Sequence, residues 1–528
     1  MLNLSILLEA SAQDYPEQTA VIFNDRKLSY AQLNAAANMF AHGLKKLGVQ
    51  KGDNVALMMP NLPFFPIAYY GILKTGATVV PFNVLFTARE VAYHLNDSDA
   101  VVLVAFANFF EPAYGGFQQV EHCRSLVVAN ADPSQPFAHD DAAIIDFNKF
   151  LGMGGSPPEY VSDVFDTVQT QADDVAVILY TSGTTGSPKG AQLTHSNMVH
   201  NAMISRELAN FNLGDVALVT LPLFHSFGQT VLMNAGFYSG ATLTLLPRFT
   251  PDAALGIMQR DNVSIFAGVP TMYWSLFSYP HAEEQFDMKM IAENLHTAVS
   301  GGSALPVELL RNFEARFNVP ILEGYGLSET SPVASFNIRR KPRKPGSIGI
   351  PIWGVQLALV DDSDNFVPDP TEGEELTAVG EIVIRGHNVM KGYYKRPEAT
   401  AEVMSKDWFH TGDLAKRDRD GYYFIVDRKK EMILRGGFNV YPREIEEYLM
   451  THPKVSLVAV KGVPDDKMGE EVKAFIVLKP GTSATADEIM EFAKQGLASY
   501  KYPRYIEFRS QLPMTATGKI LKRELKDE

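Results

Sequence analysis

Short apolar runs alternate with helix-period segments through most of the first 350 residues, and this alternation restricts the chain to a small set of layered folds. The runs are rich in Val, Ile and Leu and predict buried strands at residues 55–59, 100–106, 175–180, 241–247 and 264–270. Amphipathic segments such as 29–48 and 87–100 predict helices between them. Strands and helices that alternate in this way build substantially parallel sheets. We therefore expect an α/β fold with a large, multi-lobed N-terminal domain of layered sheets and helices.

The character of the sequence changes after this region. Strand signals dominate residues 355–427 and predict a β-rich subdomain, whereas the basic, proline-broken stretch 339–348 predicts a solvated loop. From residue 432, helical and strand signals together predict a compact α+β domain of ordinary size. We therefore expect an N-terminal domain over 1–427, a hinge over 428–431 and a small, mobile C-terminal domain over 432–528.

Charge and targeting signals limit the partners. The formal net charge of −14 argues against nucleic-acid binding, which usually requires a basic face. No apolar run reaches the roughly 18 residues of a spanning helix, and the N-terminus lacks the basic region of a signal peptide. We expect a cytoplasmic protein with no nucleic-acid partner and at most peripheral membrane contact; a homodimer is compatible with the sequence.

Cys123 is the only cysteine, which excludes an internal disulfide and a multi-cysteine metal site. It precedes an apolar run, and free cysteines are commonly buried. We expect Cys123 to be a buried spectator, so that any thiol used in a reaction comes from another molecule.

The strongest local signal is the segment Tyr180–Gly190, YTSGTTGSPKG, directly after a predicted strand. Its glycines and hydroxyl residues suit a loop whose backbone N–H groups surround phosphate oxygens, and Lys189 adds a positive charge. The segment is not a Walker loop, because Pro188 precedes the lysine and Gly190 follows it.

With this loop the chain resembles the adenylate-forming superfamily, which includes acyl-CoA synthetases, luciferases and the adenylation domains of peptide synthetases. The resemblance extends from GILKTGATVVPFN near residue 71 to TGKILKREL at the end, with the motifs in the family's order. MILRGGFNVYPREIEEYL is most similar to bacterial fatty-acyl-CoA ligases. The resemblance implies an ATP-dependent ligase that uses Mg²⁺, ATP and coenzyme A (CoA).

The resemblance also implies the nucleotide site. Its residues are Thr181, Ser182, Gly183, Thr184, Thr185, Gly186, Lys189, Gly301, Gly302, Ser303, Glu323, Gly324, Tyr325, Gly326, Thr330, Asp413 and Arg428. In this assignment Tyr325 stacks on adenine, Thr330 contacts the α-phosphate and Glu329 holds Mg²⁺. Asp413 and Arg428 bind the ribose hydroxyls.

The remaining site residues follow from the same motifs. Lys519 corresponds to the lysine that binds the reacting carboxylate and the α-phosphate, and His225 borders that carboxylate. The acyl pocket is assigned to Phe224, His225, Gly228 and Val269. Gly436 and Gly437 line the CoA channel, and Lys430 occupies the hinge position.

The chemistry calls for these residue types independently of the resemblance. A carboxylate that attacks a phosphate brings two anions together, so cations must neutralise them. Mg²⁺ takes hard oxygen ligands, and one carboxylate such as Glu329 together with phosphate oxygens is a usual set. The compact ammonium of Lys519 suits a developing negative charge. No general base is needed in the first step, because a carboxylic acid is ionised at neutral pH.

Several reactions of the superfamily remain open. Amino-acid activation is disfavoured, because the segment Leu221–Gly228 carries no aspartate to pair with a substrate ammonium. Leu434 stands where luciferases tend to place a second lysine, which is mild evidence against an oxidative reaction. A silent nucleotide sensor has no need of the catalytic set. The first choice is a medium- or long-chain fatty acid and CoA; an aryl acid, or a separate carrier protein as the acceptor, is the alternative.

Lys519 and Gly437 lie in the same predicted small domain but match residues that serve different half-reactions. We therefore expect a two-step cycle in which this domain turns about Lys430 between adenylation and thioester formation.

Overall fold

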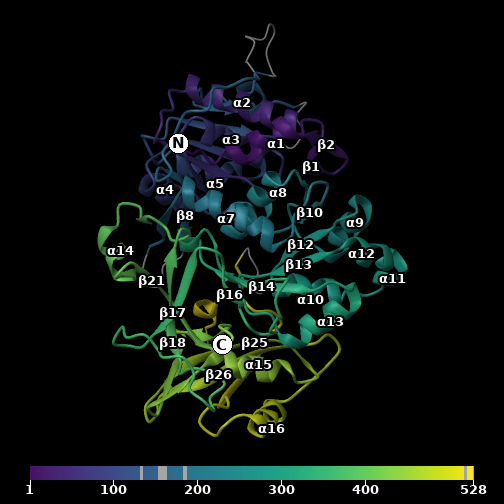
Figure 1. The fold of residues 1–528 in the computed structure, drawn as a ribbon, viewed down its shortest axis with the longest axis vertical. Coiled ribbons are helices and arrows are strands. Elements are labelled where there is room, and N and C mark those ends of the chain that lie inside the picture. Colours follow the sequence, from purple (N-terminus) through teal and green to yellow (C-terminus); the bar gives the residue numbers. More distant parts are fainter. Residues whose placement is uncertain (131–134, 153–162, 182–186, 516–519, 527–528) are drawn as a thin grey trace. The chain divides into compact units, whose positions relative to one another are not determined.

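The computed structural model describes residues 1–130, 135–152, 163–181, 187–515 and 520–526 of the chain. The chain divides into two compact units. Unit 1 holds Met1–Arg343, Pro351–Gln356 and Arg385–Ser405; unit 2 holds Lys344–Ile350, Leu357–Ile384 and Lys406–Glu528. Figure 1 labels their helices and strands. The layered sheets of unit 1 and the smaller α+β region near the C-terminus confirm the expected fold class.

Unit 1 contains two large sheets. The eight-stranded sheet has the order β19-β9-β8-β4-β3-β5-β6-β7 and the nine-stranded sheet the order β16-β15-β14-β13-β12-β10-β11-β1-β2. The first comprises β3 (Asn54–Met58), β4 (Thr78–Pro81), β5 (Ala100–Phe106), β6 (Ser125–Ala129), β7 (Ile144–Asp146), β8 (Val175–Thr181), β9 (Lys189–Thr194) and β19 (Gly392–Tyr393). The second comprises β1 (Thr19–Phe23), β2 (Arg26–Ser29), β10 (Val216–Val219), β11 (Thr242–Leu245), β12 (Ile265–Gly268), β13 (Thr297–Ser300), β14 (Ile321–Gly326), β15 (Val333–Phe336) and β16 (Ile350–Pro351).

The apolar runs of the sequence become the inner strands of these sheets. β3, β4, β5 and β6 pair in parallel, and every residue of β3 and β6 is buried. Strands buried on both faces consist of continuous apolar residues for this reason. The predicted strands at 55–59, 100–106, 175–180, 241–247 and 264–270 are confirmed to within two residues at each end.

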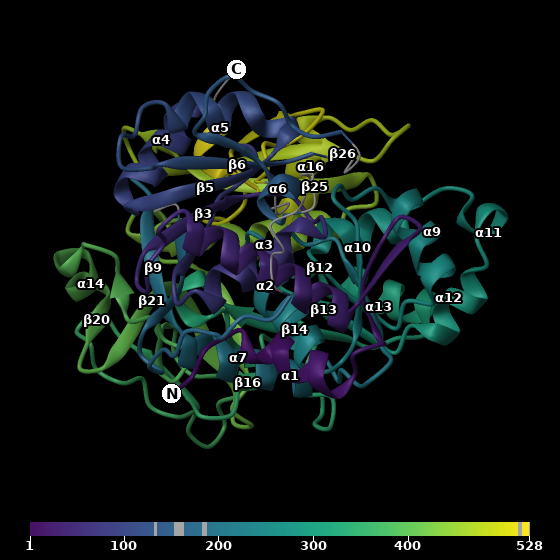
Figure 2. The same ribbon diagram turned by 90° about the horizontal axis from the view of Figure 1, so that it is seen from above.

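Helices connect the strands and begin at recognisable caps. The side chain of Ser29 accepts a hydrogen bond from the backbone of Gln32 at the start of α2 (Tyr30–Lys46), and Thr87 does the same for Glu90 in α4 (Ala88–Asp97). The other helices of unit 1 are α1 (Ile6–Asp14), α3 (Phe64–Lys74), α5 (Phe110–Phe117), α6 (Phe147–Phe150), α7 (His195–Leu208), α8 (Ala235–Tyr238), α9 (Pro251–Asp261), α10 (Pro270–Phe277), α11 (Ala282–Gln285), α12 (Met288–Asn294), α13 (Val307–Phe317) and α14 (Pro397–Val403). Helices α2 and α3 lie side by side (Figure 2).

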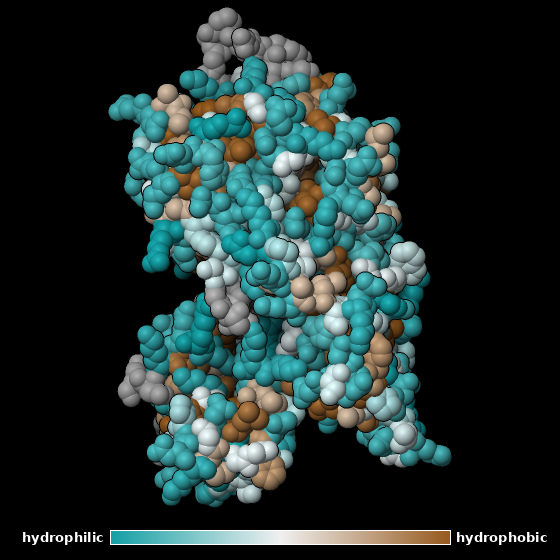
Figure 3. Space-filling view, turned by 90° about the vertical axis from the view of Figure 1, so that its left-hand side faces the viewer, coloured by the Kyte–Doolittle hydropathy of each residue, from teal (hydrophilic) through white to brown (hydrophobic). Residues whose placement is uncertain are grey.

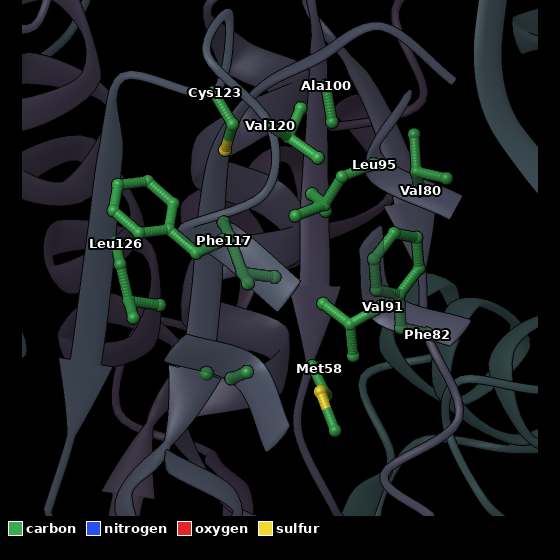
Figure 4. Packing of buried hydrophobic residues seen from close by; sticks show 14 of the residues in the cluster. Met58, Val80, Phe82, Val91, Leu95, Ala100, Phe117, Val120, Cys123 and Leu126 are labelled. Atoms are coloured by element: carbon green, nitrogen blue, oxygen red, sulfur yellow. The ribbon is translucent and has the colours of Figure 1, made fainter. Parts of the chain in front are cut away.

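Cys123 lies in a core between the eight-stranded sheet and its helices. The cluster includes Val120, Phe117 and Leu126, and Cys123 is 3% exposed (Figure 4). Burial raises the pKa of the Cys123 thiol to about 12, so the thiol stays protonated at neutral pH. The expectation that Cys123 is buried is confirmed.

Residues 385–405 differ from the expectation that 355–427 forms one β-rich subdomain, because they belong to unit 1. Their strand β19 pairs antiparallel with β9, with Gly392 opposite Gln192 and Tyr393 opposite Ala191. These partners are 200 residues apart in the sequence. No local pattern can indicate such a pairing.

Unit 2 contains two smaller sheets. One comprises β17 (Val355–Val360), β18 (Gly380–Gly386), β21 (Trp408–Arg417) and β22 (Tyr423–Arg428), and the two-residue strand β20 (Met404–Ser405) precedes β21. The other comprises β23 (Ile433–Arg435), β24 (Phe438–Val440), β25 (Val455–Asp465), β26 (Gly469–Leu478) and β27 (Tyr505–Phe508). The second sheet packs with α15 (Pro442–Met450) and α16 (Ala486–Gly496) around its own core, in which Ile445 and Leu449 are fully buried, as their spacing predicts. The boundaries at 427 and 432 remain a prediction.

The basic stretch 339–348 is a loop, but it is not simply solvated. Arg343 pairs with Glu314 within unit 1, and Lys344 lies 2.5 Å from Asp418 and 2.6 Å from Asp420 within unit 2. The stretch is a largely exposed loop, as predicted, and the structure adds that these two side chains have partners that are distant in sequence.

The face drawn in Figure 3 is mostly hydrophilic, and its hydrophobic residues form small groups among polar ones. Across the described ranges, each helix is too short or too polar to cross a bilayer.

Candidate active site

The hydroxyl- and glycine-rich segment Tyr180–Gly190 runs from the end of β8 to the start of β9, and these two strands pair antiparallel as a hairpin. Thr181 and Lys189 are opposite each other at the ends of the two strands. Ser182, Gly183, Thr184, Thr185 and Gly186 lie outside the described residues. Two tyrosines fix the hairpin at this end. Tyr180 donates a hydrogen bond to Asp97 over 2.8 Å, and Tyr93 donates one to the carbonyl oxygen of Pro188 over 2.8 Å.

Lys189 and Glu329 are brought together by Tyr393. The Lys189 ammonium lies 5.4 Å from the centroid of the Tyr393 ring, within the range of a cation–π interaction. The Tyr393 hydroxyl donates a hydrogen bond of 3.0 Å to Oε1 of Glu329. The predicted phosphate-binding lysine and the predicted metal ligand therefore contact the same tyrosine.

The carboxylate of Glu329 has the chemistry of a magnesium ligand. Glu329 is 8% exposed and lies in the short 3₁₀ turn η3 (Ser328–Thr330), whose backbone is held by a hydrogen bond from Met390 N to Glu329 O of 2.8 Å. Within the described part of the chain, Oε2 accepts no hydrogen bond from protein, and no group of three or more possible ligands could hold a metal by itself. A single hard carboxylate suits Mg²⁺ that takes its other ligands from phosphates and water.

Tyr393 is suited to remain a donor beside this carboxylate. Burial first, and then the negative charge of Glu329 together with the hydrogen bond to it, raise the pKa of Tyr393 well above its ordinary value. The hydroxyl therefore keeps its proton at every physiological pH.

The predicted adenine site lies where β13 and β14 end in unit 1. These strands are parallel, with Ser300 opposite Glu323, so the turn Gly301–Ser303 and the end of β14 meet at one edge of the sheet. A Cβ atom on Gly301 would lie 3.4 Å from the carbonyl oxygen of Gly324. Tyr325 is half-buried at this edge. The structure thus brings together Gly301, Gly302, Ser303, Glu323, Gly324, Tyr325 and Gly326, and their contact with adenine remains a prediction.

Thr330 is fully buried and its hydroxyl closes a backbone turn. Its Oγ1 accepts a hydrogen bond of 2.9 Å from Leu327 N and donates to the carbonyl oxygen of Pro332, 2.5 Å away. The described geometry gives Thr330 a structural role beside Glu329. Its predicted contact with the α-phosphate is untested.

Gly326 is required by the packing of this turn, and we expect Gly326→Ala to be strongly destabilising. A Cβ atom there would lie 1.8 Å from the carbonyl oxygen of Pro332, which cannot move without shifting the backbone that carries Glu329 and Thr330. The expected loss is about 3 kcal/mol or more in the free energy of unfolding. Chemical denaturation monitored by circular dichroism measures it. Gly256→Ala is the matched control, since its nearest neighbour, in Phe286, lies 3.7 Å away; equal losses in both variants would contradict the prediction.

Three of the predicted acyl-pocket residues, Phe224, His225 and Gly228, lie at the start of η2 (Phe227–Asn234), a π-helical segment of the type often found at functional sites. Phe224 and His225 are half-buried before it. Val269 is 4% exposed, and its side chain lies 3.6 Å from the position of a Cβ on Gly302. Gly228 is buried, and a Cβ atom there would lie 2.6 Å from the carbonyl oxygen of Pro222, so packing already requires this glycine.

The predicted ribose-binding pair lies in unit 2. Asp413 in β21 is opposite Arg428 in β22, and Arg428 Nε lies 2.9 Å from Asp413 Oδ1. The carboxylate is 4% exposed, so the guanidinium satisfies a largely buried charge. The structure therefore shows that the two side chains form an ion pair, while their role toward ribose remains a prediction.

The predicted hinge and CoA residues also lie in unit 2. Lys430 is exposed in a turn after β22. Gly436 and Gly437 have φ values of 57° and 82°, in the left-handed region that favours glycine. A Cβ atom on Gly437 would have no described atom within 4 Å, whereas one on Gly436 would meet the side chain of Met468. Lys519 lies outside the described residues.

The residues that sequence reasoning missed are those that act through distant partners. Tyr393 had no local signal, because its contacts depend on the β19–β9 pairing. Lys522, in the turn η4 (Lys522–Glu524), lies 2.8 Å from Glu446 and 3.1 Å from Glu431. Burial alone would lower the pKa of Lys522, but the charges of Glu446 and Glu431 raise it above its ordinary value. The segment after Lys519 is thus anchored to the predicted hinge at Glu431.

The chain is similar to proteins of known family over most of its length. Residues 8–394 match the family described as AMP-binding enzyme, and residues 444–519 match the AMP-binding enzyme C-terminal domain. A long-chain-fatty-acid–CoA ligase of Bacillus subtilis (strain 168) is 36% identical over 540 aligned residues, covering 100% of this chain and 94% of the relative. A feruloyl-CoA synthase of an Amycolatopsis species is 35% identical and covers 97% and 96% of the two chains. The solved structure of an anthranilate CoA ligase with anthranoyl-AMP matches with a TM-score of 0.87, 28% identity and coverage of 98% and 95%.

Proposed function

We propose that this chain, which belongs to the AMP-binding enzyme family and is an AMP-forming acid–CoA ligase, uses a medium- or long-chain fatty acid as its substrate. The observation that carries the proposal is the apolar character of the two segments assigned to the acyl pocket, around Leu221–Gly228 and around Val269. Leu221–Gly228 contains no charged residue apart from the titratable His225, and Val231, Val269 and Met272 are buried. Apolar pockets with few polar groups suit alkyl chains.

In the first half-reaction a carboxylate oxygen of the acid attacks the α-phosphorus of ATP and displaces pyrophosphate. Bound Mg²⁺ would neutralise phosphate charge during this step. Glu329 would hold the ion, while Lys189 and Lys519 bind phosphate and carboxylate oxygens. In the second half-reaction the sulfur of CoA loses its proton, attacks the acyl carbon and displaces AMP. Gly436 and Gly437 would line the path of the thiol.

An aryl acid is the second candidate, and a specific observation favours it. The feruloyl-CoA synthase is 35% identical over nearly the whole chain, almost the same as the fatty-acid relative. A flat ring and an alkyl chain both bury apolar surface, so the apolar character of the assigned residues does not separate them. A carrier protein in place of CoA is a third arrangement, and it changes only the second half-reaction.

A panel of acids tests the substrate assignment. Acetate, hexanoate, decanoate, palmitate, coumarate and benzoate are each supplied with ATP, Mg²⁺ and CoA, and AMP release is measured. Each buried methylene contributes about 0.8 kcal/mol, so kcat/KM should rise about fourfold per methylene until the pocket is filled. A kcat/KM for coumarate or benzoate above that of every fatty acid would overturn the fatty-acid assignment. Pyrophosphate exchange without CoA-dependent AMP release would point to a carrier protein.

A further inference from the structure

We infer that Tyr393 is a positioning residue for adenylation, whose hydroxyl orients the Glu329 carboxylate and whose ring holds the Lys189 ammonium. The inference rests on the proposed function, because it assigns Tyr393 to the metal–nucleotide half of that reaction. All three residues lie in unit 1, so the inference depends on contacts within a single unit.

The hydroxyl and the ring of Tyr393 contact different residues. The hydroxyl reaches Glu329 Oε1 at 3.0 Å in a buried hydrogen bond, and the ring face lies 5.4 Å from the Lys189 ammonium. Within the described ranges, Lys189 forms no ion pair with a carboxylate, so Tyr393 is the aromatic contact that holds its charge. No described carboxylate therefore neutralises this positive charge, which suits it to a negatively charged ligand.

The segment that carries Tyr393 is fixed on both sides. The backbone of Tyr394 donates to Gly190 O over 2.8 Å, and that of Lys391 donates to Gln192 O over 2.9 Å. The Tyr394 hydroxyl donates to Asp99 over 2.8 Å, and Arg396 pairs with Asp97. Backbone and side-chain contacts therefore hold Tyr393 next to the end of the β8–β9 hairpin that carries Lys189.

When a carboxylate binds a metal ion through one of its oxygens, a hydrogen bond to the other oxygen fixes the orientation of the carboxylate. The hydrogen bond from Tyr393 goes to Oε1, and no described residue donates to Oε2, so Oε2 is the oxygen more accessible to a cation. Removing a residue that hydrogen-bonds to a metal ligand commonly lowers the affinity for the metal by about 10- to 100-fold. Deleting only the hydroxyl should therefore weaken the metal-dependent part of ATP binding.

The test is metal-dependent ATP binding without acid or CoA. Isothermal titration calorimetry gives the Kd of ATP with Mg²⁺ and with EDTA for wild type and Tyr393→Phe. We expect the Kd with Mg²⁺ to rise about tenfold, and the Kd with EDTA to change less than twofold. Tyr393→Leu also removes the ring below Lys189 and should raise the Kd in both conditions.

Tyr394→Phe is the matched control, because it removes a hydroxyl from the adjacent tyrosine that bonds to Asp99 and not to Glu329. It should leave the Mg²⁺ dependence unchanged. In a double-mutant cycle, Tyr393→Phe should add no further change in the Glu329→Gln background. Wild-type Mg²⁺ dependence in Tyr393→Phe, or an equal change in Tyr394→Phe, would overturn the inference. If wild type binds Mg·ATP with this dependence on Tyr393 and activates an acid, but not a fatty acid, the proposed substrate fails and the inference stands.

Discussion

Replacing Glu329 with glutamine is expected to lower the rate of adenylation about 100- to 1,000-fold, the range seen when one preorganised electrostatic group is removed from an active site. Glutamine is nearly isosteric and its amide oxygen can still accept the hydrogen bond from Tyr393, so the turn η3 should keep its shape. With that oxygen bonded to Tyr393, the variant places an amide nitrogen where Oε2 stood, so it loses both the negative charge and the oxygen ligand at the predicted metal position. Acid-dependent exchange of labelled pyrophosphate into ATP measures the rate of this half-reaction.

The expected loss should depend on the metal. Raising Mg²⁺ should recover part of the rate in Glu329→Gln, because a weaker site fills at a higher concentration. The unfolding temperature of the variant serves as a control for the fold, and it should stay within a few degrees of wild type. A variant that folds and exchanges pyrophosphate at the wild-type rate would remove Glu329 from the metal site.

The second large effect is a separation of the two half-reactions. Lys519→Ala should lower pyrophosphate exchange about 100-fold or more, because a cation that binds the reacting carboxylate and α-phosphate is lost. Thioester formation from supplied acyl-AMP should largely survive. Gly437→Trp should do the reverse and block CoA while adenylation continues.

The structure adds a necessary control to this comparison. Gly437 has a φ of 82°, so every substitution there strains the backbone, although nothing described lies within 4 Å of an added Cβ. Gly437→Ala carries the same strain without the bulk and should retain most of the thioester rate. Equal losses in Gly437→Ala and Gly437→Trp would indicate strain instead of a blocked channel. Equal damage to both half-reactions by Lys519→Ala and Gly437→Trp would contradict the division of roles.

The parts of the fold that follow local sequence rules could be predicted from the sequence. β5 is the apolar run 100–106 without a change of boundary, and α15 places Ile445 and Leu449 in a core as their four-residue spacing requires. Non-local pairing could not be predicted in this way. The assignment of 385–405 to unit 1 depends on β19 and β9, which share no local sequence signal.

The same division applies to the candidate site. Family motifs assign Asp413 and Arg428 to the same sugar, and the structure adds that they face each other on adjacent strands. The roles of Tyr393 and Thr330 within the site depend on packing. Tyr393 reaches Glu329 only because a distant segment returns to the hairpin, and the hydroxyl of Thr330 is directed into its own turn. A motif gives the type of residue but not the partner that occupies its polar atoms.

The β19–β9 pairing also constrains synthesis of the chain on the ribosome. Strand β9 is complete by Thr194, but its outer neighbour, Gly392–Tyr393, emerges about 200 residues later. At about 5–20 residues per second this delay lasts roughly 10–40 s, during which the edge of β9 has no partner. A nascent chain released or cleaved within that interval would lack the tyrosine beside Glu329. Such a chain would expose a strand edge on which chaperones act and other chains aggregate.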